Sequence, residues 1–149
     1  MNHILTKLDE LFPFLHQRSA TEEDFHNYCD INGIEVFFSS EISTGVSILY
    51  EGNPYIFLNN KLRGFRLLNV MFHELAHCIF HFPSQARFGT EFFSTHFREK
   101  NHIEADAVSA LLLLPTYELH NALQNIEFAS EDLEDLIGTR LELYGKYNV

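Results

Sequence analysis

The chain has 149 residues, 46% of them hydrophobic and fifteen of them phenylalanine, which is enough to bury one core without disulfide bonds. Its 21 acidic and 10 basic residues give a net charge of −11, so its surface repels phosphate backbones and direct nucleic-acid binding is disfavoured. The two cysteines form no CxxC pair, and there is neither a signal peptide nor a run of 18 apolar residues. We expect a single domain, 1–149, that is cytoplasmic and has no membrane segment.

Two helices are predicted at the beginning of the chain. Leucines at helical spacing predict an amphipathic helix between Leu5 and Leu15, with a kink or break at Pro13. Thr21, followed by three acidic residues, predicts the capped start of a second helix, and Asn32-Gly33 predicts its end.

Three short β-type runs follow, at 34–38, 46–50 and 55–58. Turn residues at Thr44-Gly45 and Gly52-Asn53-Pro54 separate them. The simplest arrangement is a largely antiparallel meander.

The second half of the chain is predicted to be mainly helical. A long helix over 62–82 ends at Pro83, and 83–98 has no clear periodicity and is expected to form a loop. Further helices are predicted over 101–114, over 116–125 and after Ser130. The predicted fold class is α+β, with a small three-stranded, mainly antiparallel sheet packed with five or six helices.

The segment His73-Glu74-Leu75-Ala76-His77 carries the strongest chemical signal. On an α-helix, residues four apart are separated by only about 40° around the axis, so His73 and His77 can direct two ring nitrogens to one metal ion. Glu74 lies on the same side, where a base must stand to take a proton from water at the metal.

Two histidines at this spacing are also compatible with ordinary core residues. The run from Leu67 to Phe82 is almost entirely apolar otherwise, which predicts a helix buried on all sides. A buried carboxylate and two buried imidazoles are each unfavourable without a partner, and one divalent cation satisfies all three. We therefore expect a zinc site.

A catalytic zinc site needs a third protein ligand, and we expect it on the helix after Asn101. At helical spacing from Glu104 lies an apolar stripe of Ala107, Val108 and Leu111. A separate polar stripe contains His102, Asp106 and Ser109. Because a carboxylate directed at the core is unfavourable unless paired, Glu104 is the preferred ligand.

Other candidate ligands are His81, His96, Glu99 and Asp106. His81 continues the i+4 series, but three successive turns of a straight helix do not converge easily on one ion. A buried or cleft-lining His81, hydrogen-bonded within the protein, is favoured over ligation. Asp106 could instead orient a ligand histidine from outside the metal.

These motifs resemble the ImmA/IrrE family of metallopeptidases. The resemblance covers the block from His73 to His81 and the block from Glu104-Ala105-Asp106 to Pro115. It extends upstream to Ile56–Asn59, which is similar to the strand before the active-site helix, and downstream to Thr139–Leu143, which is similar to the closing helix.

The resemblance implies zinc bound by His73, His77 and Glu104, with Glu74 as the catalytic base. It also implies a substrate class, because several members of the family cleave helix-turn-helix repressors of mobile-element, phage or stress-response genes. The expected partner is therefore a basic repressor, which the acidic surface of this chain favours.

We predict a zinc-dependent endopeptidase, with His96, Tyr117 and His120 as candidates for stabilising the oxyanion. The alternative is a non-catalytic, zinc-containing binding module, an antirepressor that sequesters a regulator. Glu74 favours catalysis, because a structural site has no use for a carboxylate beside an open coordination position.

Overall fold

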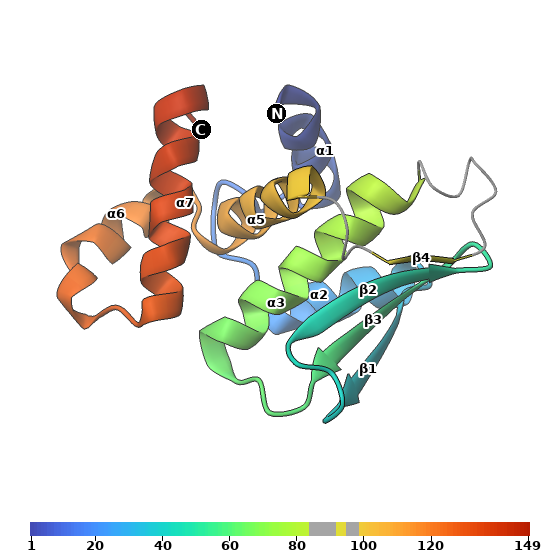
Figure 1. The fold of residues 1–149 in the computed structure, drawn as a ribbon. Helices are drawn as coiled ribbons and strands as arrows, with labels where there is room; N and C mark the ends of the chain where they lie inside the picture. The colour runs from blue at the N-terminus through green and yellow to red at the C-terminus, as the bar shows by residue number, and fades with distance from the viewer. Residues whose placement is uncertain (84–91, 95–98) are drawn as a thin grey trace.

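The computed structural model describes residues 1–83, 92–94 and 99–149, and for 92–94 it describes the backbone only. In chain order, two helices precede three strands, and further helices follow (Figure 1). The first half contains α1 (Asn2–Leu11), α2 (Glu22–Ile31), β1 (Glu35–Ser39), β2 (Gly45–Tyr50) and β3 (Asn53–Asn59). The second half contains α3 (Gly64–Ala76), the π-helix η1 (His77–His81), β4 (Phe92–Ser94), α5 (Glu99–Leu113), α6 (Thr116–Gln124), the 3-10 helix η3 (Ile126–Phe128) and α7 (Glu131–Tyr147). The α+β class predicted from the sequence is confirmed.

The sheet is mixed, with strand order β1-β3-β2-β4. β1 pairs with β3 in parallel, whereas β2 is antiparallel to β3 and to β4. The predicted meander order is therefore wrong, because β3 lies between β1 and β2. Strands β2 and β3 form a tight hairpin: its turn residues, Glu51 and Gly52, have φ of 50° and 80°, which suits a two-residue turn between strands.

The segment 83–98, predicted to be a loop, contributes β4 to the sheet. β4 pairs with Ile48–Tyr50 of β2 and has only three residues, too few for a recognisable periodicity. His96 and most of the remaining segment lie outside the described residues.

Local signals in the sequence account for the start and end of several helices. α1 ends before Pro13, as expected. α2 begins with a capping box in which the Thr21 hydroxyl accepts from Asp24 N–H and the Asp24 carboxylate accepts from Thr21 N–H. The predicted helix over 62–82 is present, but it changes character: α3 ends at Ala76, and Phe82 N–H bonds to the carbonyl of His77 in the i→i+5 pattern of a π-helix.

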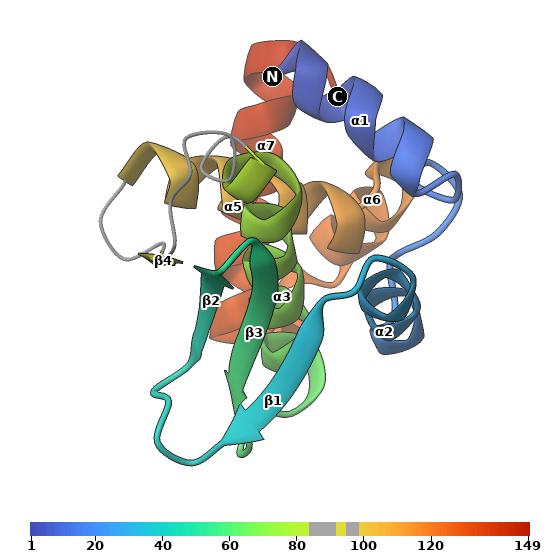
Figure 2. The same cartoon turned by 90° about the vertical axis from the view of Figure 1, so that its right-hand side faces the viewer.

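Helix α3 lies at the centre of the molecule. One side of it packs on β2 and β3, and the opposite side packs on α5, which in turn contacts α7 (Figures 1 and 2). α2 covers the sheet beside α3 at the β1 end (Figure 2). These elements supply many of the largest fully buried apolar side chains, and α1 and α7 add Ile4, Leu8 and Ile137; the others are Phe25, Ile56, Leu58, Met71, Phe72, Leu75 and Leu112. The motif predicted from the sequence is thus carried by a helix that other elements cover on two sides.

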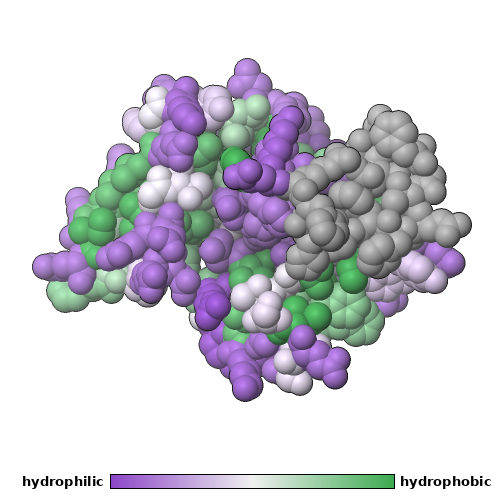
Figure 3. All heavy atoms as spheres, viewed as in Figure 1, coloured by the Kyte–Doolittle hydropathy of each residue, from purple (hydrophilic) through white to green (hydrophobic). Residues whose placement is uncertain are grey.

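The surface where α5 crosses α3 is hydrophilic in the view of Figure 3, between apolar regions over the α6–α7 side and over the sheet. The histidines of the candidate metal centre, which are described in the next subsection, lie beneath this surface. No helix in the described part of the chain is long and apolar enough to cross a bilayer.

Gly45, the first residue of β2, permits the close contact between the sheet and α3. A Cβ atom at this position would lie 2.6 Å from Val70 Cγ1 and 3.2 Å from Glu74 Cγ. Leu58 Cδ2 of β3 would lie 3.4 Å from the same Cβ atom, so an added methyl group would meet side chains of both α3 and β3.

We expect Gly45→Ala to lower the free energy of unfolding by about 1–3 kcal/mol, because the added methyl group overpacks the contact between β2 and α3. Urea denaturation of the variant and the parent measures the difference. Gly138→Ala is the matched control: it lies in α7 with no atom within 4 Å of the added Cβ. Helix propensity should make that variant as stable as the parent or more stable, by up to about 1 kcal/mol. A Gly45→Ala protein at least as stable as the parent would show that the sheet and α3 are not in close contact.

Candidate metal centre

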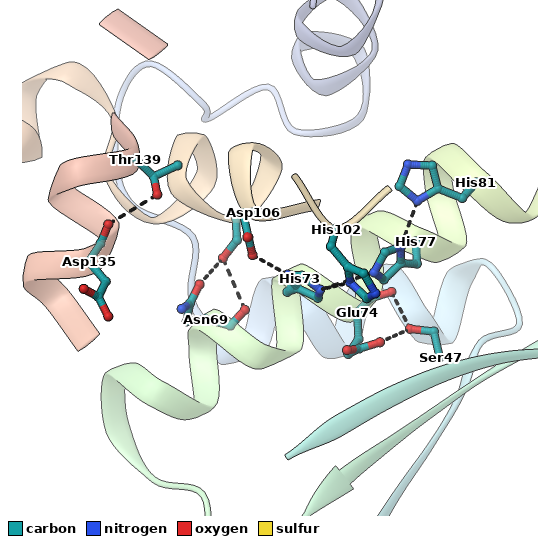
Figure 4. Close-up of polar contacts among 11 residues, drawn as sticks. Ser47, Asn69, His73, Glu74, His77, His81, His102, Asp106, Asp135 and Thr139 are labelled. Atoms are coloured by element: carbon teal, nitrogen blue, oxygen red, sulfur yellow. Dashed lines mark hydrogen bonds and ion pairs between the residues drawn. The ribbon is translucent and has the colours of Figure 1, made fainter. Parts of the chain in front are cut away.

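A seam of polar side chains joins α3 to α5, which run antiparallel (Figure 4). At one end of the seam, Ser109 Oγ donates to Asn69 Oδ1 over 2.7 Å. In the middle, His73 Nδ1 lies 2.7 Å from Asp106 Oδ1. At the other end, His73 Nε2 lies 3.3 Å from His102 Nδ1. The polar stripe of α5 identified in the sequence therefore faces α3.

Three histidines converge at the end of this seam. Ligand atoms of His73, His77 and His102 all lie within 4.8 Å of one another. The Nε2 atoms of His73 and His77 are 3.2 Å apart, and His102 Nδ1 lies at 3.3 Å from the first of them. Tetrahedral zinc with Zn–N bonds of about 2.0–2.1 Å separates its ligand nitrogens by roughly 3.3–3.4 Å. These two distances match the ligand spacing of such an ion.

The carboxylate predicted as the third ligand has other neighbours. Glu104 Oε2 lies 3.3 Å from His81 Nε2, and Glu104 Oε1 lies 3.8 Å from Lys100 Nζ. His81 is itself buried, and its Nδ1 lies 2.8 Å from His77 Nδ1. His81 is thus hydrogen-bonded within the protein, as the sequence predicts, and it stands between Glu104 and the histidine group.

Asp106 occupies the position predicted for an orienting residue. Its carboxylate accepts from the Nδ1 side of His73, whose Nε2 faces the other two histidines. This contact fixes which ring nitrogen of His73 is available to a metal.

Glu74 is 6% exposed and lies between α3 and β2. Its carboxylate is hydrogen-bonded to the hydroxyl of Ser47, which is fully buried on β2 and also contacts the Glu74 carbonyl oxygen at 2.9 Å. Glu74 shares a 320 Å³ pocket with His73, His102, Thr44, Gly45, Asn69 and Val70. A carboxylate, two of the three histidines and the N-terminal end of β2 therefore face one cavity.

The protonation of the histidines follows from their surroundings. Burial and the neighbouring histidines lower the pKa of His77 to about 2, and burial also lowers the pKa of His81, partly offset by Glu104. Burial acts in the same direction on His73, but the hydrogen bond to Asp106 and nearby negative charges outweigh it and raise its pKa. His77 and His81 are therefore neutral at pH 7, and a neutral imidazole is the form that binds a metal.

Among the remaining candidates, those that the structure describes are not in this cluster, namely Glu99, Tyr117 and His120. Glu99 is exposed in the first turn of α5. Tyr117 and His120 are exposed on α6, which packs against α7, on the far side of α7 from the histidines (Figure 1). Sequence reasoning overlooked His102 and Ser47. The sequence signal for His102 was the polar stripe that it forms with Asp106 and Ser109 at positions i, i+4 and i+7. No sequence pattern marks Ser47.

Comparison with known families identifies the chain. A family model described as the IrrE N-terminal-like domain, a peptidase family, matches residues 29–142, which is about three quarters of the chain. The chain belongs to this family. The match spans the whole α3–α5 seam and both blocks of the ImmA/IrrE resemblance. No curated protein and no solved structure matches the chain.

In the metal-free protein, we expect His77 to make folding stability depend on pH below about 6.5. The unfolded chain binds a proton at that pH, whereas folded His77 excludes it until about pH 2. The stability contribution is therefore complete above the ordinary pKa and is lost on acidification, at up to about 1.4 kcal/mol per pH unit. Urea unfolding of chelator-treated protein between about pH 7 and pH 5 measures this slope.

The His77→Gln variant lacks the titrating ring and should show a shallower slope over the same range. His120→Gln, an exposed position on α6, should retain the parental slope. Equal slopes for the parent and His77→Gln would mean that His77 titrates normally in the folded state.

Proposed function

We propose that this protein is a zinc-dependent endopeptidase, with zinc held by His73, His77 and His102 and with Glu74 as the general base. One observation carries the proposal: three imidazole nitrogens converge within 4.8 Å of one another, beside a buried carboxylate that lines the same pocket as two of these histidines. Membership of a peptidase family supports the same reading.

His102 replaces Glu104 as the proposed third ligand. The ring nitrogen of His102 is within 3.3 Å of His73 Nε2, whereas the Glu104 carboxylate contacts His81, on the opposite side of His77. Three protein ligands leave one coordination position of a tetrahedral ion for water or substrate.

When bound, zinc would supply Lewis-acid chemistry, lowering the pKa of a coordinated water from about 15.7 towards about 7 and polarising the scissile carbonyl. Glu74 accepts the proton of the attacking water and then returns it to the leaving amine. The Ser47 hydroxyl donates to the Glu74 carboxylate and holds it at the wall of the pocket.

For the substrate, we propose a basic helix-turn-helix repressor. The support is the resemblance to ImmA/IrrE proteins, together with a net charge of −11 that attracts a basic partner.

His102→Ala should weaken zinc binding by more than the roughly 10–100-fold that outer partners of a metal ligand contribute, because it removes a direct ligand. Glu104→Gln should stay within that range. Competition with a chromophoric chelator gives the affinity, and elemental analysis gives the bound metal. If Glu104→Gln loses its zinc and His102→Ala retains it, the third ligand is Glu104, as the sequence analysis suggested.

Glu74→Gln should retain zinc and lose about 10²–10⁴-fold in cleavage rate, because it removes the general base. The assay incubates the protein with the purified product of an adjacent repressor gene and follows fragments by mass spectrometry. The exposed Glu127→Gln is the matched control and should cleave at the parental rate. A chelator should stop cleavage by the parent. A stable complex without fragments would favour the antirepressor alternative.

A further inference from the structure

We propose that the groove between α2 and the open edge of β1 binds an extended, basic segment of a partner protein, which adds one strand to the sheet. β1 is the outermost strand on the side of α2 (Figure 2), and the groove has a volume of about 400 Å³. It shares no lining residue with the pocket of the candidate metal centre, so the inference goes beyond the proposed function.

Alternate residues of β1 direct their backbone groups away from the sheet. The carbonyl oxygen of Ser39 accepts from an N–H group just after β3, so Ser39 faces β3. The N–H and C=O groups of successive strand residues point to opposite sides, so those of Val36 and Phe38 point to the open edge. Ile34, two residues before Val36, donates its N–H on this side to a carbonyl oxygen of α2. In the described part of the chain, no strand pairs with this side of β1, which leaves a template for one more strand.

The composition of β1 does not protect this edge. Proteins commonly block an exposed edge strand with proline, with lysine or with a bulge. The sequence of β1 is Glu-Val-Phe-Phe-Ser, and its register with β3 is continuous over all of these residues. An apolar edge without such protection is suited to pairing with an extended segment of another protein.

Phe38 provides the apolar wall of the groove. Its partner in the register, Leu58, is fully buried, and paired residues direct their side chains to the same face of a sheet. Phe38 therefore lies on the face that the helices cover, yet 49% of it is exposed. An apolar side chain of an added strand would remove this surface from water.

The charges beside the groove favour a basic occupant. Asp30 and Glu35 line the groove and are exposed, and the lining contains no lysine or arginine. His26, on the same wall, lies 3.6 Å from the Glu22 carboxylate. Asp30 is also in the last turn of α2, where no basic residue compensates the negative end of the helix dipole. An extended segment with lysine or arginine therefore complements the groove.

The same charges disfavour a second copy of this chain as the occupant. Pairing of two β1 edges would bring Asp30 and Glu35 of both copies to one interface, and each copy carries a net charge of −11. We therefore assign the groove to a different, basic protein.

A fluorescein-labelled octapeptide of alternating lysine and valine is the probe, and fluorescence anisotropy measures its binding. It should bind saturably, with one peptide per chain. The same octapeptide with glutamate in place of lysine should not bind, because the groove repels it. A version with every backbone nitrogen methylated keeps the charges but cannot pair with a strand, so it should bind at least about tenfold more weakly. Equal binding of the methylated peptide overturns the inference.

A pair of charge-reversal variants tests whether the probe occupies this groove. Glu35→Lys should weaken binding of the lysine–valine peptide roughly 3–10-fold, because an attractive charge becomes a repulsive one. Glu127→Lys makes the same change in net charge at an exposed site on η3 and should bind like the parent. If both variants bind the peptide equally, its binding reflects overall charge, and the groove is not the site.

Amide hydrogen exchange, measured by NMR, locates the added strand. The N–H groups of Val36 and Phe38 should exchange at least about tenfold more slowly when the probe is bound, whereas Phe37, which faces β3, should be unchanged. Unaltered exchange at Val36 and Phe38 with the peptide bound overturns the inference. Slow exchange at both positions in the free protein, lost on dilution, makes a second copy of the chain the occupant and overturns it too.

Discussion

The structure depends on the antiparallel contact between α3 and α5, which brings buried and partly exposed imidazoles together with the carboxylates of Asp106 and Glu104 beside an apolar interior. Each of these groups is unfavourable in the core unless another polar group meets it. The seam meets this requirement pairwise, from Asn69 with Ser109 through His73 with Asp106 to the three convergent histidines. Each of these contacts also sets the spacing of the next one. The contacts between the two helices therefore fix both the register of the helix pair and the geometry of the candidate metal centre.

The sheet contributes to the same centre from the other side of α3. Gly45 lets β2 approach the helix closely enough for the buried hydroxyl of Ser47 to reach Glu74. The order β1-β3-β2 places the hairpin strand β2, rather than β1, beside the active-site helix. The catalytic-type carboxylate is therefore held between two rigid elements, which limits the reorientation that it would need during a reaction.

Features with a local cause could be predicted from the sequence, and features that depend on distant pairing could not. The motif at His73 to His77, the cap at Thr21 and the end of α1 near Pro13 are local, and the structure contains each of them. The parallel pairing of β1 with β3 and the short β4 depend on contacts that no local pattern encodes. Glu104 was preferred as a ligand because a carboxylate directed at the core needs a partner, and in the structure Glu104 lies beside His81. In the structure the polar stripe faces α3, because polar groups gather where they can satisfy one another.

A histidine in the third position changes the electrostatics of the proposed site. Two histidines and a glutamate would neutralise half of the charge of a divalent ion directly, whereas three neutral imidazoles leave it complete. The compensating negative charge lies further out, at Asp106 directly behind His73 and at Glu104 behind His81, which contacts His77. The ligands thus gain basicity from their carboxylate partners while the full charge remains available to water and a scissile carbonyl. Placing the carboxylates behind the histidines therefore favours both tight metal binding and strong Lewis acidity of the ion. A directly bound carboxylate would increase the first property and decrease the second.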